Sequence, residues 1–334
     1  MSERPALSVV MPVKNGGQWL HTAVDSVLQQ SFTDFELLVI DDHSFDGSVE
    51  QLPQDPRLKV LRHPGSGIVE SLNHGLVKAK GEFIARMDGA DICHPERFQR
   101  QMDFAHQHPQ VGIVGGLVEI FSDGSTVSDD NISYQEWLNR LQSHAEIARE
   151  LFVHAPFLHS SVLMRKPIFQ KVGLYRDLSW PEDYDLWLRA WLRGIEFAKV
   201  PELVLMWREH PERITHTDRR YATKEFIKAK AWALSESLLK DRSAIICGTS
   251  KAALKLCDVL RALGVRVAGF ADVTPDSADT QHHDLPTLSY EAMLAQRGDA
   301  LLIGALGRRG ASEQLRQIFA ASRLVEGHDF ILAG

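Results

Sequence analysis

Apolar runs and amphipathic segments alternate along the first part of the chain. Leu7–Val13 and residues 35–40 are nearly continuous apolar runs, which is typical of strands buried on both faces. Residues 19–30, between them, carry apolar side chains at helical spacing. The pattern then repeats as strand, helix and strand, at residues 58–61, 67–80 and 82–87. Because strands and helices alternate, the sequence predicts a parallel α/β sheet.

The pattern becomes less regular after residue 110 and is regular again near the C-terminus. In the irregular part, we predict helices at residues 134–150 and 181–193. We also predict strand segments there at 111–121, 156–165 and 204–207. An amphipathic helix follows at 218–240, after which strands and helices alternate again. This C-terminal region contains predicted strands at 244–247, 265–270 and 300–304 and a predicted helix at 251–263. We therefore predict an α/β domain over 1–217, a linker helix over 218–241 and a small Rossmann-like domain over 242–334.

Composition narrows the class of protein without naming a function. The chain has 334 residues, 44% of them hydrophobic and 24% charged, which suits a globular protein of two domains. A net charge of −7 gives no electrostatic reason to expect a nucleic-acid partner, so we predict none. The three cysteines lack metal-ligand spacing, and no apolar run approaches the ~20 residues of a membrane span. We expect reduced thiols and a cytoplasmic protein.

Acidic residues follow two of the predicted strands directly. Asp41 and Asp42 end the second strand, and in parallel sheets ligands bind beyond the carboxyl ends of the strands. A carboxylate there can accept a hydrogen bond from a pyrimidine imide N–H or from ribose hydroxyls. The alternative is that Asp42 and Ser44 only cap the next helix. Both interpretations remain open on this cluster alone.

Asp88 and Asp91 form a second acidic cluster, after the strand at 82–87. Acidic oxygens in such a loop can hold a divalent cation that bridges a diphosphate and neutralises a departing nucleotide. The alternative is helix capping, because Pro95 opens the next predicted helix. On its own, this cluster slightly favours capping.

Glu182 and Asp183 form a third acidic cluster, in the first turn of the helix at 181–193. Acidic residues in a first turn are stabilised by the helix dipole, which is a purely structural reason for them. In a functional interpretation, one of them is a general base that removes a proton from an acceptor hydroxyl. The neighbouring Trp180, Tyr184 and Trp187 offer flat surface for a sugar, but the core is the more common place for such side chains.

The order of these clusters resembles glycosyltransferase family 2 over about residues 5–215. Each matching segment stands in the family's order along the chain. The segments are 7–15, 26–37, Asp41-Asp42-His43-Ser44-Phe45-Asp46-Gly47-Ser48, Leu72-Asn73-His74-Gly75, 79–88, His94-Pro95-Glu96-Arg97-Phe98 and Glu182-Asp183. So dense an ordered match is highly specific.

The resemblance implies a GT-A fold and sugar transfer with inversion. A nucleoside-diphosphate sugar, with uridine as the expected nucleoside, would donate to a glycan or lipid-linked acceptor of a surface polysaccharide. The pocket for base and ribose would be lined by Pro12, Val13, Asn15, Asp42 and Gly67, with Asn73 nearby. A lipid-linked acceptor leaves open a peripheral association with the membrane.

The resemblance also assigns the remaining roles. Asp88 would begin the metal-binding motif, with Mn²⁺ or Mg²⁺ as the cofactor. Asp183 would be the catalytic base beside Glu182, and His159 would lie near the reacting centre. Arg208 and His210 would lie near the diphosphate; all of these residues are present in the sequence.

Ala90 departs from the family pattern. The usual motif is Asp-x-Asp-Asp, whereas this chain reads Asp88-Gly89-Ala90-Asp91, so an alanine stands where the principal metal-binding carboxylate is expected. Either Asp91 takes over coordination, or Asp88 acts with water and phosphate, or the protein works without metal. An alternative function is therefore a nucleotide-sugar-binding regulatory or scaffold protein with weakened catalysis.

The C-terminal domain keeps only the first glycine of a dinucleotide-binding loop, in Gly248-Thr249-Ser250. Asp272 ends the next strand, where a ribose-binding acid would stand. Residues 267–272 and 283–286 resemble the nucleotide-sugar-binding domain of bacterial sugar acyltransferases. Homo-oligomerisation or docking through this domain is the alternative, and we favour it over ligand binding.

Overall fold

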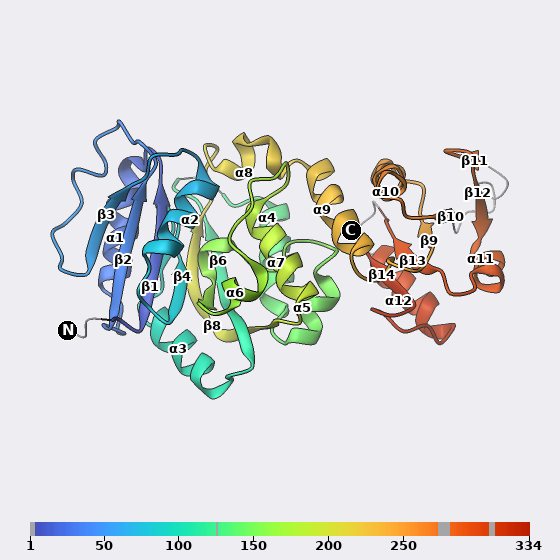
Figure 1. The fold of residues 1–334 in the computed structure, drawn as a ribbon, viewed down its shortest axis with the longest axis horizontal. Coiled ribbons are helices and arrows are strands. Elements are labelled where there is room, and N and C mark those ends of the chain that lie inside the picture. The colour runs from blue at the N-terminus through green and yellow to red at the C-terminus, as the bar shows by residue number, and fades with distance from the viewer. Residues whose placement is uncertain (1–3, 125, 273–280, 307–310) are drawn as a thin grey trace. The chain divides into compact units, whose positions relative to one another are not determined.

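The computed structural model describes residues 4–124, 126–272, 281–306 and 311–334 (Figure 1). Contacts between residues divide the chain into two compact units. The first contains Met1–Ile147, Pro156–Asp177 and Arg193–Thr217, and the second contains Ala148–Ala155, Leu178–Leu192 and Asp218–Gly334. The division after Thr217 coincides with the predicted end of the first domain. Two shorter segments of that predicted domain group with the second unit instead, so the domain boundaries stay a prediction.

The first unit is built on an eight-stranded sheet in the described part of the chain. In spatial order its strands are β3 (Leu58–Arg62), β2 (Phe35–Asp41), β1 (Leu7–Val13), β4 (Phe83–Arg86), β7 (Leu163–Arg165), β6 (Val111–Phe121), β8 (Glu196–Arg208) and β5 (Ile92–Cys93). The first four are parallel, and β7 runs antiparallel to both β4 and β6. The register of β1 on β2 places Val13 beside Asp41, so both strands end at the same edge.

The first unit also contains helices, several of which pack on its sheet. They are α1 (Leu20–Leu28), α2 (Ile68–Lys78), α3 (Arg97–Gln107), α4 (Asp129–Arg140), α6 (Ile168–Val172) and α8 (Ile214–Thr217), while α5 (His144–Glu150) spans the division between the two units. α2 packs directly on β1 and β2 (Figure 1). Gly75 allows this approach, because a Cβ there would lie 2.4 Å from Cγ1 of Val10. All residues of β1 and β2 are buried, as their continuous apolar pattern predicts.

The irregular region differs from its predicted elements in several places. The helix predicted at 134–150 is two helices, because Leu141 is extended and Glu146 accepts hydrogen bonds from Ser143 at the start of α5. The strand predicted at 156–165 is a 3₁₀ turn at His159–Ser161 followed by the short β7. β8 is longer than predicted, because it tolerates Pro201 at a register shift where it pairs with β6.

The second unit contains α7 (Glu182–Leu192) and α9 (Thr223–Ser235). Hydrogen bonds and ring contacts hold these helices and the segment at 148–155 together. Tyr184 donates to the carbonyl of Leu151 at 2.7 Å, and Trp180 stacks on Trp232 with ring centroids 6.3 Å apart. These contacts explain why residues 148–155 and 178–192 group with the C-terminal residues.

The C-terminal part of the second unit is a Rossmann-like α/β fold, as predicted. Its strands, in spatial order, are β11 (Gln281–His282), β12 (Leu285–Ser289), β10 (Val267–Asp272), β9 (Ala244–Cys247), β13 (Leu301–Gly304) and β14 (Phe330–Leu332). All neighbours are parallel except β11 and β12. Its helices are α10 (Lys251–Ala262), α11 (Tyr290–Gln296) and α12 (Ala311–Ala321).

The described helices have no segment that is both long enough and apolar enough to cross a lipid bilayer.

Candidate functional site

Asp41 stabilises the loop after β2. Its carboxylate is fully buried and accepts hydrogen bonds from the backbone N–H of Ser44 and from Nε of Arg62, both at 2.8 Å. Burial alone would raise the pKa of Asp41, but the hydrogen bonds from Ser44 and the charge of Arg62 outweigh it and lower the pKa. Asp41 therefore stays ionised and holds the loop in place.

Asp42, the next residue, has one oxygen engaged and one open. Oδ2 accepts from the backbone N–H of Gly67 at 3.0 Å and from Nζ of Lys14 at 3.2 Å. Oδ1 is buried and accepts no hydrogen bond from the described residues; the nearest basic group is Nε2 of His63, at 3.7 Å. Leaving a buried acceptor unpaired costs about 1–3 kcal/mol. This oxygen is thus an acceptor suited to a ligand N–H or O–H.

Most of the predicted base and ribose pocket gathers around this carboxylate. The backbone N–H of Asp42 donates to the carbonyl of Val13 at 2.7 Å, and Pro12 precedes Val13 in β1. Asn15 has a left-handed backbone (φ 52°) and links the two strand-end loops, donating to Ser44 and accepting from Phe45. Gly67 also adopts a positive φ of 95°, so its backbone conformation requires glycine.

Asn73 has a different set of contacts from the other predicted pocket residues. Its amide exchanges two hydrogen bonds of 2.9 Å with the backbone N–H and carbonyl of Tyr175. Asn73 therefore ties α2 to the segment after α6, and a role in the donor pocket would act through that connection.

The loop between β4 and β5 carries the second acidic cluster. Asp88 is 28% exposed and forms ion pairs with Arg86 and with Nη2 of Arg213, the latter at 3.2 Å. Burial would raise the pKa of Asp88, but the two arginines outweigh it and lower the pKa. Asp88 is thus an ionised carboxylate already held by two guanidinium groups.

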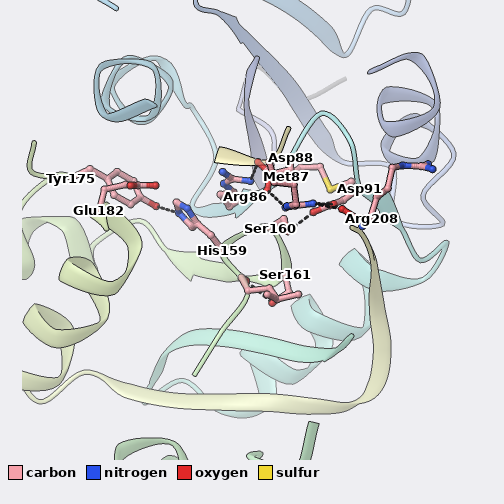
Figure 2. Close-up of polar contacts among 12 residues, drawn as sticks. Arg86, Met87, Asp88, Asp91, His159, Ser160, Ser161, Tyr175, Glu182 and Arg208 are labelled. Carbon is pink, nitrogen blue, oxygen red and sulfur yellow. Dashed lines mark hydrogen bonds and ion pairs between the residues drawn. The ribbon is translucent and has the colours of Figure 1, made fainter. Parts of the chain in front are cut away.

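Asp91 is fully buried and its contacts occupy both oxygens. Oδ2 accepts from Oγ of Ser160 at 2.6 Å, as Figure 2 shows. Oδ1 accepts from the backbone N–H of Arg208 at 3.1 Å and from Nη1 of Arg213 at 2.9 Å. Asp91 therefore joins the acidic loop to the end of β8 and to the segment after it.

Arg208 and His210 lie over the same loop. Nε of Arg208 donates to the carbonyl of Ala90 at 2.8 Å, and its guanidinium forms an ion pair with Asp123. The ring of His210 lies 4.4 Å from that of Trp19, and its buried Nδ1 has no hydrogen-bond partner among the described residues. Burial and the charge of Arg213 lower the pKa of His210. The structure thus brings Asp88, Asp91, Arg208 and His210 together, and their roles at a metal and a diphosphate stay a prediction.

His159 is buried on the 3₁₀ turn before β7. Its Nε2 lies 2.7 Å from the hydroxyl of Tyr175, a contact visible in Figure 2. Burial, reinforced by the charge of Arg86, holds the pKa of His159 well below its usual range. His159 is therefore a neutral imidazole at pH 7.

Glu182 and Asp183 begin α7 and belong to the second unit. Glu182 is buried and accepts from the hydroxyl of Tyr221 at 3.2 Å. Asp183 is half-buried, and its Oδ1 accepts from the backbone N–H of Tyr184 at 2.7 Å. Tyr184 and Trp187 are fully buried, which confirms that these two aromatic residues belong to the core.

Sequence reasoning missed three contributors to the site: Arg86, Ser160 and Arg213. Arg86 stands inside the matching segment 79–88 and Ser160 follows His159, but no spacing rule assigns either of them a partner. Arg213 lies 122 residues from Asp91 in sequence, so only the folding back of the segment after β8 brings them together. An arginine close behind Arg208 and His210 was the only available signal.

The residues that could hold a metal ion are few. The described residues contain no group of three or more His, Cys, Asp or Glu side chains placed to bind one ion. Gly89 and Ala90 lack side-chain oxygens, and both oxygens of Asp91 already accept hydrogen bonds from other residues. Asp88 is the one exposed carboxylate of the described loop between Arg86 and Asp91.

Comparison with known proteins identifies the family. The family model described as Glycosyl transferase family 2 matches residues 8–173. An uncharacterised glycosyltransferase of Haemophilus influenzae is 30% identical over 202 residues, covering 58% of this chain and 71% of that protein. The chain belongs to glycosyltransferase family 2. The amylovoran biosynthesis glycosyltransferase AmsE of Erwinia amylovora is 29% identical, over 56% of this chain and 69% of its own.

Solved structures of glycosyltransferases share the fold. S. aureus TarS (residues 1–349), solved in complex with UDP-GlcNAc, aligns with a TM-score of 0.54 at 18% identity over 76% of this chain and 71% of that chain. The mannosyltransferase PcManGT from Pyrobaculum calidifontis, in complex with GDP-Man and Mn²⁺, aligns with a TM-score of 0.51 at 15% identity, over 96% and 81%. At these identities the likeness establishes the GT-A fold of this family 2 glycosyltransferase and does not choose its donor.

Proposed function

We propose that this family 2 glycosyltransferase moves a sugar from a uridine-diphosphate sugar to a glycan or lipid-linked acceptor, with inversion at the anomeric carbon. The observation that supports it most is the open, buried Oδ1 of Asp42 at the carboxyl end of β2. A uracil imide N–H is a donor of matching chemistry for this carboxylate oxygen. TarS, which shares the fold, is solved with UDP-GlcNAc.

Inversion requires one displacement at the anomeric carbon. The acceptor oxygen forms a bond to that carbon while the bond to the diphosphate oxygen breaks and its electron pair leaves with the diphosphate. We assign removal of the acceptor proton to Asp183, whose half-buried carboxylate stands in the first turn of α7. Glu182, buried and bonded to Tyr221, would act beside it as a positioning residue.

His159 fits a role near the sugar that does not need a positive charge. Its low pKa keeps it neutral, so it can position a hydroxyl but contributes no cation to the leaving diphosphate. The acceptor class rests on relatives, among them AmsE, named for amylovoran biosynthesis. A lipid-linked acceptor would bring the protein to the membrane surface as a peripheral protein.

The test begins with calorimetric titration of the protein with UDP and GDP in Mn²⁺ buffer. We expect UDP to bind at least about tenfold more tightly than GDP, a difference of ~1.4 kcal/mol. Equal affinities would contradict the uridine assignment, and no binding of either would contradict the function. NMR of slow UDP-sugar hydrolysis then gives the anomer released first. Release of the β-sugar from an α-linked donor supports inversion, and release of the α-sugar contradicts it.

A second candidate function is a nucleotide-sugar-binding protein with weakened turnover, which Ala90 favours because it removes an expected metal ligand. Single-turnover transfer to a panel of lipid-linked and free glycan acceptors separates the two. Formation of up to one molecule of glycosylated product per enzyme molecule supports the transferase. Tight UDP-sugar binding without any hydrolysis or transfer would favour the binding protein.

A further inference from the structure

The loop after β4 contains Ala90, the main departure of this chain from the family's sequence pattern. Resting on the proposed function, we propose that this chain binds the diphosphate of its donor without a divalent cation, through the guanidinium groups of Arg86 and Arg213. The ligand set, the balance of charge and the positions of the arginines each support this.

The ligands present do not fit a divalent cation. Mn²⁺ and Mg²⁺ need several oxygen ligands, and in such sites carboxylates anchor the ion. Ala90 has no side-chain oxygen, and both oxygens of Asp91 already accept hydrogen bonds from Ser160, Arg208 and Arg213. Asp88 remains, but it lies between two guanidinium groups that would repel a cation at the same carboxylate.

The charges of the cluster are balanced without a metal. Three carboxylates, Asp88, Asp91 and Asp123, form ion pairs with three guanidinium groups. Those groups belong to Arg86, Arg208 and Arg213, whose side chains are 6–8% exposed. An aspartate at position 90 would leave one carboxylate in excess, which is the charge that a bound cation would offset. Ala90 removes that excess, so the cluster is neutral before the donor arrives.

The two arginines are also held in position to receive a phosphate. Arg213 lies over the ring of Trp207, with its guanidinium carbon 3.9 Å from the ring centroid, and donates to the carbonyl of Arg208 at 2.6 Å. Arg86 is buried at the end of β4. Both contact Asp88, which is partly exposed, so a diphosphate can take over hydrogen bonds that Asp88 now accepts. Guanidinium groups bind phosphate oxygens in the same forked geometry as carboxylates.

His210 adds a neutral donor beside the arginines. Its buried Nδ1 has no partner among the described residues, and its pKa is lowered by burial and by Arg213. In the transfer step, the bond from the anomeric carbon to the diphosphate oxygen breaks, and the electron pair stays on that oxygen. The fixed guanidinium groups stabilise this developing charge because they need no reorganisation during the step.

The experiment is calorimetric titration of the full chain with UDP, in EDTA and then in Mn²⁺, on the native protein and two variants. We expect the native affinity for UDP to agree within about threefold between the two buffers. Ala90→Asp adds a carboxylate to the balanced cluster, so UDP affinity in EDTA should fall about tenfold and Mn²⁺ should restore it. Ala90→Asn is the matched control, because it adds the same volume without charge and should change the affinity in EDTA by less than threefold.

A further variant tests competition at the arginines directly. If Asp88 and the diphosphate share Arg86 and Arg213, Asp88→Asn keeps or tightens UDP binding in EDTA. If Asp88 anchors a metal, the same change lowers affinity in Mn²⁺ by more than about tenfold. UDP binding by the native protein only in Mn²⁺ would overturn this inference and leave the proposed function standing. Absence of UDP and GDP binding in both buffers would overturn both.

Discussion

The parallel strands of the two sheets end in different kinds of polar group. At the carboxyl ends of β1, β2 and β4, carboxylates and guanidinium groups are buried together, and one buried oxygen of Asp42 has no hydrogen-bond partner among the described residues. At the ends of β9 and β10, the polar side chains bond to one another. Oγ1 of Thr249 donates to Asp272 at 3.0 Å, and Ser250 caps α10 while donating to the carbonyl of Ala305 at 3.2 Å.

The difference shows that topology alone does not make a ligand site. Both sheets place loops at the carboxyl ends of parallel strands, where α/β folds bind ligands. Gly248 in the second sheet has a positive φ of 114°, and a Cβ there would lie 2.9 Å from the carbonyl oxygen of Ala305. The close packing of Gly248 against Ala305, the residue after β13, therefore explains this glycine. Among the described residues, the first sheet combines a buried, unpaired carboxylate oxygen with buried guanidinium groups, and the second does not.

The largest expected effect is a loss of kcat on replacing Asp183 of α7, which tests whether the second unit contributes to catalysis through this helix. Asp183→Asn keeps the size and the acceptor oxygen for Tyr184 but removes the base. We expect kcat for sugar transfer to fall by about 10³, within the range for loss of general base catalysis, with UDP affinity unchanged. Asp241→Asn, on the exposed surface of the same unit, is the control and should keep full activity. An Asp183→Asn enzyme that retains most of its kcat would remove α7 from the mechanism.

The next effect concerns the stability of the buried charges in the first unit. Asp91→Ala leaves Arg213 and Ser160 without their buried acceptor, and breaking a buried pair costs about 3–5 kcal/mol. The melting temperature should fall by roughly 10 °C. Asp123→Ala removes a carboxylate that is 53% exposed and should cost about 1 kcal/mol or less. Equal losses in thermal unfolding would mean that burial does not distinguish the two carboxylates.

The sequence predicts the strands and helices of both sheets well where burial is uniform. Leu7–Val13 and Ala244–Cys247 have the predicted bounds, because a strand covered on both faces must be apolar along its whole length. The prediction was wrong for residues 156–165, where the buried polar side chains of His159 and Ser160 bond to Tyr175 and Asp91. Such bonds depend on partners far away in sequence, so local periodicity does not reveal them.

The site residues fall into the same two groups: those that local sequence locates and those whose partners are distant in sequence. Motif order locates Asp42, Asp88 and Asp91, because each follows a strand whose end is visible in the sequence. The pairing of Asp88 with Arg213 spans 125 residues and arises only when the segment after β8 folds over the loop. No spacing rule links two such positions, so the balance of charge around Ala90 could not be predicted.

A third prediction uses pH to test the buried His159 of the first unit. Burial, reinforced by the charge of Arg86, holds the pKa of His159 well below its usual range. Because the unfolded chain binds this proton near pH 6.5 and the folded chain does not, stability falls as pH decreases from 7 to 5.

Denaturant unfolding at pH 7 and pH 5 measures this fall. His159→Gln should reduce the difference in free energy of unfolding between the two pH values. His328→Gln, at a side chain 78% exposed, should leave it unchanged. An unchanged difference in the His159→Gln variant would locate the acid sensitivity in the carboxylates instead.

The smallest expected effect compares UDP binding after the same substitution at the ends of β2 and β10. Asp42→Asn keeps the shape of the side chain but weakens the acceptor that faces the donor's base, so UDP should bind about tenfold more weakly, ~1.4 kcal/mol. Asp272→Asn makes the same exchange at the end of β10, where Thr249 already occupies an oxygen, and should change UDP affinity by less than about twofold. Calorimetric titration of both variants under identical conditions decides the comparison. If Asp272→Asn weakens UDP binding as much as Asp42→Asn does, the second sheet takes part in donor binding and the contrast between the two sheets fails.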